Sequence, residues 1–105
     1  MMVVLGKIEF HPDDLAAATA LMLDLTRETR QEPECMHYAF GQDLAATNRF
    51  WLSEQWRSEA ALVEHFKLPH MAAFRAGLSR VRVLHLEASS YGATAAQDLI
   101  GRRTE

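Results

Sequence analysis

Apolar and polar positions alternate with two different periods in the first third of the chain. Residues 2–10 are mostly apolar and β-branched, which predicts a strand. Pro12 ends this strand because proline removes a backbone donor and suits the first turn of a helix. After the acidic pair at 13–14, apolar residues recur at three- and four-residue steps, at Leu15, Ala18, Met22 and Leu25. This spacing predicts a helix that stops before Pro33.

The middle of the chain has the pattern of a β-hairpin. Residues 35–44 alternate as a second strand, and its larger side chains share one face: Met36, Tyr38 and Phe40. Residues 45–48 predict the turn, and residues 49–56 predict a third strand. Because the connection is short, the two strands are expected to pair antiparallel.

The next segment predicts a helix in two pieces. Ser58 is a typical N-cap, so the first piece is expected to run from there to Phe66. Pro69 interrupts it, because proline cannot continue a helix interior. Residues 70–78 predict the second piece, with an apolar side formed by Met71, Phe74 and Leu78.

The end of the chain predicts a fourth strand and a tail. Residues 81–91 read as the strand, and from Gly92 onward the residues are small, polar or charged. We therefore expect one domain over residues 1–92 and a C-terminal tail over residues 93–105, with a weak helical turn at 95–100.

The element order is β-α-β-β-α-β, which predicts an α+β fold of the ferredoxin-like type with a four-stranded antiparallel sheet. In this fold the helices cover one face of the sheet. The third strand nevertheless carries large aromatic residues on both faces, with Phe50 and Trp56 on one and Trp51 on the other. An uncovered aromatic patch promotes aggregation, so we expect a homodimer in which two sheets pack face to face.

Composition narrows the classes of function. At 105 residues with 49% hydrophobic and 24% charged residues, the chain is an ordinary globular domain without a membrane span. A net charge of -3 argues against nucleic acid as a partner. The first residues lack the features of a signal peptide, so a cytoplasmic location is expected. Cys35 is the single cysteine, which excludes an internal disulfide and a multi-cysteine zinc site.

Glu54 is the most informative residue, because it is a carboxylate placed among the aromatic residues of the third strand. It shares a face with Phe50, Leu52 and Trp56. If that face points toward the helices, burial raises the pKa of Glu54 and makes it a base or a partner that holds His65 in one tautomer. The alternative is an ion pair with an arginine at the sheet margin, either Arg49 or Arg57.

His65 is the first candidate for a catalytic base, because imidazole titrates near neutral pH. The alternative is a histidine on the helix surface. His70, just after Pro69, either orients a substrate oxygen or caps the second helical piece, and Trp56 either packs in the core or supports a substrate. No metal is expected, because His65 and His70 are five residues apart across a proline rather than four apart on one helical face.

Four blocks of the sequence resemble the antibiotic biosynthesis monooxygenase family, a group of dimeric α/β-barrel proteins that includes small quinol monooxygenases. The blocks are the first strand and residues 29–35, 49–56 and 60–70. Each block is short, and their order and spacing carry the resemblance. The haem-degrading branch is a poor match, because Gly6, His65 and Arg75 stand at its signature positions. The polyketide-oxidising branch matches at Trp56 but departs from this sequence at Leu52 and Leu62.

The resemblance implies a homodimer whose subunits each have a pocket between sheet and helices, and oxidation by O2 without metal or flavin. Our hypothesis is a cofactor-independent monooxygenase that acts on a small quinol-like or enolisable aromatic. His65 or Glu54 would be the base, and the substrate-binding residues would be Trp56, His70, Leu52 and Phe74. The alternatives are an isomerase or retro-aldol-type enzyme acting on a small hydroxy-ketone, and a non-catalytic ligand-binding dimer.

Overall fold

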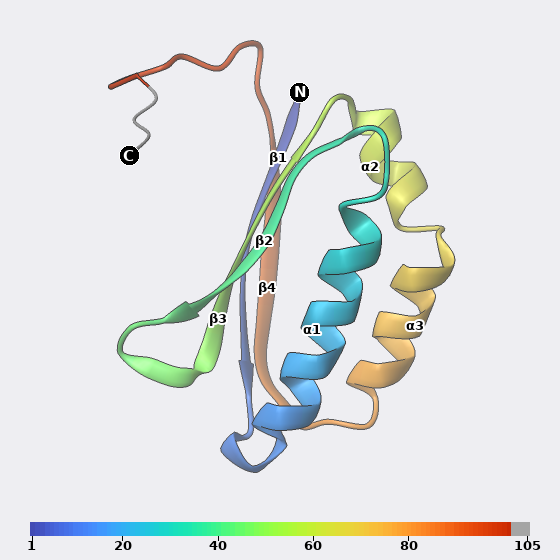
Figure 1. Ribbon diagram of the computed structural model, residues 1–105, viewed down its shortest axis with the longest axis vertical. Helices are drawn as coiled ribbons and strands as arrows, with labels where there is room; N and C mark the ends of the chain where they lie inside the picture. Colours follow the sequence, from blue (N-terminus) through green and yellow to red (C-terminus); the bar gives the residue numbers. More distant parts are fainter. Residues whose placement is uncertain (102–105) are drawn as a thin grey trace.

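A computed structural model describes residues 1–101 and shows one antiparallel sheet with helices on one side (Figure 1). In chain order the elements are β1 (Met2–Phe10), a 3-10 turn η1 (Pro12–Asp14), α1 (Leu15–Thr29), β2 (Cys35–Asp43), β3 (Ala46–Trp56), α2 (Glu59–His65), α3 (Pro69–Leu78) and β4 (Val83–Gly92). The strands lie in the order β2-β3-β1-β4. This arrangement confirms the predicted ferredoxin-like α+β fold.

The break between α2 and α3 lies where the sequence predicts it. Ser58 caps α2, because its side chain accepts a hydrogen bond from the Ala61 backbone N–H at 3.1 Å. Pro69 stands at the start of α3, where its missing N–H removes no helical hydrogen bond. The turn between the two helices gives α3 a direction of its own, alongside α1 (Figure 1).

The start of α1 is fixed to the start of β4 by one carboxylate. Asp14 accepts hydrogen bonds from the Arg82 backbone N–H at 2.8 Å and from its Nε at 3.0 Å. The arginine lowers the pKa of Asp14 to about 2. These bonds join two segments that are far apart in the sequence. β4 begins at Val83, directly after Arg82 and two residues later than predicted.

The hairpin turn is tighter than the sequence prediction of residues 45–48. Asp43 pairs with Ala46, so the connection is only Leu44 and Ala45. The Asp43 carboxylate closes it by accepting from the Ala45 backbone N–H at 2.7 Å. This side-chain bond stabilises the short turn, and β3 therefore begins at Ala46.

The core lies between the sheet and the helices, and the alternation of the strands places it there. The buried apolar residues are Val4, Ile8, Phe10, Ala18, Met22, Leu25, Tyr38, Phe50, Trp56 and Leu62. Met36 was expected on the same face as Tyr38 but is 47% exposed. The register of β2 against β3 shifts between Cys35 and His37, which turns Met36 out of the alternation.

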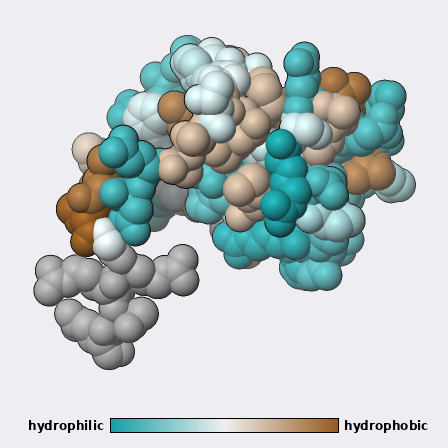
Figure 2. Space-filling model, turned by 90° about the horizontal axis from the view of Figure 1, so that it is seen from above, coloured by the Kyte–Doolittle hydropathy of each residue, from teal (hydrophilic) through white to brown (hydrophobic). Residues whose placement is uncertain are grey.

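Residues 93–101 form neither helix nor strand, so the predicted helical turn at 95–100 is wrong. Leu99 and Ile100 are exposed there, because no helix forms that could pack them against the sheet. Figure 2 shows apolar side chains close to the grey atoms of the chain end. The last four residues of the expected tail, 102–105, lie outside the described part. Among the described residues, no helix is long and apolar enough to span a membrane.

Candidate functional site

A cavity of about 270 Å³ lies between the sheet and the helices. All four strands, the three α-helices and the turn after α2 contribute to its wall, which is mostly apolar. Its polar or charged lining residues are Lys7, Tyr38, Glu54, His65, Arg75 and Glu87. The cavity is slightly smaller than typical small-molecule pockets, which have roughly 300–1,000 Å³, and therefore suits a ligand of one or two rings.

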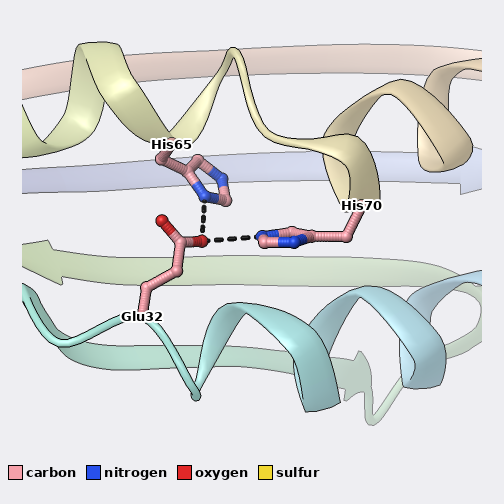
Figure 3. A group of neighbouring side chains, drawn as sticks. All are labelled: Glu32, His65 and His70. Atoms are coloured by element: carbon pink, nitrogen blue, oxygen red, sulfur yellow. Dashed lines mark hydrogen bonds and ion pairs between the residues drawn. The ribbon is translucent and has the colours of Figure 1, made fainter.

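One carboxylate oxygen holds two histidines at the edge of this cavity. Glu32 lies in the loop between α1 and β2, and its Oε2 is 2.6 Å from Nδ1 of His65 and 2.7 Å from Nε2 of His70 (Figure 3). A carboxylate only accepts, so each imidazole donates its N–H to the shared oxygen. The two bonds connect the α1–β2 loop to the end of α2 and the start of α3.

Only 1% of the surface of His65 is exposed, although this histidine is the last residue of α2. Its ring lies 4.5 Å from that of Trp56, measured between centroids, and it also lines the cavity. Burial lowers the pKa of His65, and the hydrogen bond that its ring donates to Glu32 opposes this shift. Because Nδ1 donates to Glu32, the neutral ring carries its lone pair on Nε2. Among residues 1–101, the side-chain hydrogen bond of His65 is at Nδ1, and none is formed at Nε2.

Glu54 is 5% exposed and faces the helices, as the alternation of β3 predicts. The indole Nε1–H of Trp56 donates to its Oε1 at 2.8 Å. Burial raises the pKa of Glu54, the hydrogen bond from Trp56 lowers it, and the nearby charge of Glu32 raises it further. Glu54 is thus a buried carboxyl group whose proton is held more tightly than usual.

Two alternatives for Glu54 are excluded within the described chain. Arg49 pairs with Glu9 and Asp43 instead, and Arg57 lies beside Glu34. Glu54 is also not the partner that orients His65, because Glu32 takes that position.

The cavity brings together four of the six residues selected from the sequence: His65, Glu54, Leu52 and Phe74. Trp56 is fully buried behind the wall, where it contacts His65 and Glu54. His70 does not line this cavity and donates to Glu32.

Sequence reasoning missed Glu32 and Tyr38 as site residues. Glu32 marks the end of a helix and belongs to the block 29–35 that resembles the family, but nothing near it in the sequence indicates contact with a histidine 33 residues away. Tyr38 is predicted as a strand residue, and the structure shows that it also lines the cavity. Burial raises the pKa of Tyr38, so it is a neutral hydrogen-bond donor at physiological pH.

The same cluster has the composition of a metal site. In the part of the chain that the structure covers, Glu32, His65 and His70 form the one group of three or more potential ligands whose ligand atoms lie within 4.8 Å of one another. The spacing argument against a metal considered only two histidines four residues apart on one helical face, and it did not include Glu32. Because the helix is broken at Pro69, a five-residue separation brings both rings to one point.

Comparisons with known proteins agree with this fold. The family model described as "Antibiotic biosynthesis monooxygenase" matches residues 1–77. A Synechocystis protein named "Uncharacterized protein sll1783" is 38% identical over 72 residues, which is 69% of this chain and 49% of the relative. The chain thus spans about half the length of that curated relative.

Solved structures extend the likeness to nearly the whole chain. A provisionally named antibiotic biosynthesis monooxygenase from Deinococcus radiodurans is 26% identical, with a TM-score of 0.89 over 96% of this chain and 100% of that one. Rv0793 from Mycobacterium tuberculosis is 24% identical, with a TM-score of 0.83 over 92% of this chain and 98% of that one. At this identity the second match supports the fold alone.

Proposed function

Because this chain belongs to the antibiotic biosynthesis monooxygenase family, we propose that it oxidises a small quinol-like or enolisable aromatic compound with molecular oxygen. The reaction needs no metal or flavin if the substrate, once deprotonated, is electron-rich enough to reduce oxygen directly. The protein then has to bind the substrate, remove a proton and exclude water. The apolar cavity under the helices suits these three tasks.

One observation carries the proposal: His65 lines the cavity with Nδ1 bound to Glu32 and Nε2 without a protein partner. A carboxylate behind an imidazole fixes its tautomer and stabilises the imidazolium that forms when the ring takes a proton. His65 is therefore the base, Glu32 its positioning residue, and His70 holds Glu32 in place. Tyr38 and Glu54 are the polar groups that orient a substrate oxygen.

The reaction balances without an external reductant. Nε2 of His65 takes the proton of a substrate O–H, and the resulting anion passes one electron to O2. The superoxide and the substrate radical combine at a ring carbon that carries a hydrogen, and the resulting peroxide takes the proton back from His65 to give a hydroperoxide. Its O–O bond and the hydrogen–carbon bond at the same carbon then break, so that one oxygen stays on the carbon as a carbonyl and the other leaves as water with that hydrogen. The substrate supplies all four electrons, and His65 ends in its starting protonation state.

We also propose that the protein acts as a homodimer. The sheet face opposite the helices carries Leu5 and Trp51, which are 52% and 50% exposed, in a hollow that Tyr91 also lines. A second copy of the same face would cover these residues. The cavity on the helical side stays within each subunit.

The test is oxygen uptake across a panel of quinols, for wild type and for His65→Ala, Glu54→Gln and Trp56→Phe. A general base contributes roughly 10²–10⁴-fold, so His65→Ala is expected to lose most of the rate. His11→Asn, at a histidine outside the cavity whose ring accepts a hydrogen bond from the Asp13 backbone N–H, is the matched control, because asparagine can keep that bond.

Two results would contradict the proposal. Equal rates in wild type and in all three variants would remove these residues from the mechanism. Turnover of a hydroxy-ketone without oxygen would indicate the isomerase alternative, which needs the same base but no O2.

A further inference from the structure

We propose that Glu32, His65 and His70 form a binding site for one divalent transition-metal ion of the zinc type, and that this ion competes with the use of His65 as a base. The metal site stands on the geometry of the cluster. Its consequence for activity rests on the proposed function.

The geometry of the cluster is convergent. Nδ1 of His65 and Nε2 of His70 both point at one oxygen of Glu32, from 2.6 and 2.7 Å (Figure 3). An ion bound near the present position of that oxygen would need nitrogen distances of about 2.0–2.1 Å. The two rings would then move inward by about 0.5–0.7 Å each.

For the ion to enter, the Glu32 carboxylate has to move back from its present position, and it then binds the ion as the third ligand. Glu32 belongs to the loop between α1 and β2 and not to a helix or strand, and its side chain has three rotatable bonds. Its second oxygen, Oε1, has no hydrogen-bond partner among residues 1–101. A rotation of this side chain therefore breaks only the bonds that the metal replaces.

The chemistry of the three ligands selects the kind of ion. Two neutral imidazoles and one carboxylate are a common set for zinc, cobalt and iron, and leave at least one coordination position open. Magnesium and calcium prefer all-oxygen sites and are expected to bind weakly.

A second cavity supplies the route of entry. A groove of about 400 Å³ on the outer side of Glu32 is lined by Glu34, Glu64 and Trp56, among others. Glu34 and Glu64 are exposed acidic residues of this groove, and each lies beside a basic side chain, Arg57 and Lys67 respectively. His65 is on the far side of Glu32 and lines the inner cavity. The ion thus reaches the cluster without crossing the substrate cavity.

Metal binding changes what His65 presents to a substrate. An ion bound to Nδ1 displaces the hydrogen from that nitrogen, so the neutral ring keeps its hydrogen on Nε2. The atom that accepts a proton in the metal-free protein becomes a donor in the metal-bound protein. The metal is therefore expected to inhibit oxidation.

The experiment is a titration of the untagged, metal-free full chain with cobalt chloride, followed by visible absorption and calorimetry. Wild type is expected to bind one ion per chain with a visible absorption band of a nitrogen- and oxygen-bound Co2+, and Zn2+ is expected to displace it. Second-shell partners already contribute about 10–100-fold to metal affinity, so His70→Gln and Glu32→Gln are expected to weaken binding by at least that factor. His37→Gln is the control and should bind like wild type.

The outcomes separate the two proposals. No absorption band in wild type at millimolar Co2+, or equal binding in wild type and both cluster variants, would overturn the metal site. If the variants fail to fold, paramagnetic shifts of the His65 and His70 ring protons in wild type decide the question, and the absence of such shifts would overturn the metal site.

Once a substrate has been identified, Zn2+ should lower oxygen uptake in wild type more than in His70→Gln. Absence of oxygen uptake in the metal-free protein would count against the proposed function and leave the metal result standing.

Discussion

At the scale of single residues, the site contains two titratable groups whose pKa values are shifted in opposite directions by their surroundings. Burial lowers the pKa of His65 and raises that of Glu54, so at neutral pH the imidazole is free to accept a proton and the carboxyl group holds its own more tightly. Such a pair places a base and a carboxyl group with a raised pKa within one apolar cavity.

Replacing Glu54 with glutamine tests whether the pKa of this carboxyl group is raised in the folded protein. Its pKa is higher in the folded than in the unfolded protein, so it contributes stability at low pH that is lost as pH rises through the folded pKa. Glutamine keeps an acceptor for Trp56 and is never charged. Glu54→Gln is therefore expected to raise the melting temperature at pH 8 and to change it little at pH 4.

The measurement is thermal unfolding from pH 4 to pH 8, with Glu28→Gln on the exposed surface of α1 as the control. The control should stay within about 0.5 kcal/mol of wild type at every pH. If the Glu54→Gln variant becomes less stable than wild type as the pH rises, the fold favours the ionised carboxylate of Glu54.

The same scale shows what the sequence could and could not predict about the site. Glu54, His65 and Leu52 could be assigned to the cavity because the period of a strand and the end of a helix are local patterns. Glu32 could not, because its loop reaches His65 only after α1 and α2 pack on the same sheet face. His70 was chosen for its position after a proline, and only the folded chain shows that it donates to Glu32.

At the scale of elements, the close approach of α1 and α3 depends on a glycine. Gly77 is buried in α3, and a Cβ atom added there would overlap Cδ2 of Leu21 and lie 3.0 Å from its Cδ1. The absent side chain lets the two helices approach above the cavity. This glycine has a packing role that its low helix propensity alone would hide.

Gly77→Ala is expected to destabilise the fold by about 1–3 kcal/mol through overpacking, although alanine favours helices. In a Leu21→Ala background the obstacle is gone, so the same substitution should stabilise by about 1 kcal/mol. Urea unfolding of the four proteins measures both effects. Stabilisation by Gly77→Ala in the wild-type background would show that Leu21 moves aside freely.

The elements themselves could be predicted from the sequence because each has its own periodic pattern and its own stop residue, such as Pro12, Pro33 and Pro69. The turn at Leu44-Ala45 and the register shift before His37 could not be predicted. Both depend on how β2 pairs with β3, through the Asp43 carboxylate and the ladder, and not on the composition of either strand.

At the scale of the whole molecule, the uncovered sheet face makes a clear prediction about assembly. Wild type is expected to sediment as a dimer, and Leu5→Glu is expected to dissociate it because two buried charges would face each other across the interface. Val63→Glu, on the exposed side of α2, is the control and should remain dimeric. A wild type that sediments as a single subunit at all concentrations would contradict the homodimer.

The most direct test of the account concerns the two nitrogens of one ring. Long-range ¹H–¹⁵N correlation spectra of metal-free protein at neutral pH, with the signals assigned by comparison with His65→Gln, report which nitrogen carries the hydrogen. We expect His65, which lines the cavity, to have a protonated Nδ1 bound to Glu32 and an unprotonated Nε2. A hydrogen on Nε2 at this pH would leave the cavity without its base and would contradict the central claim.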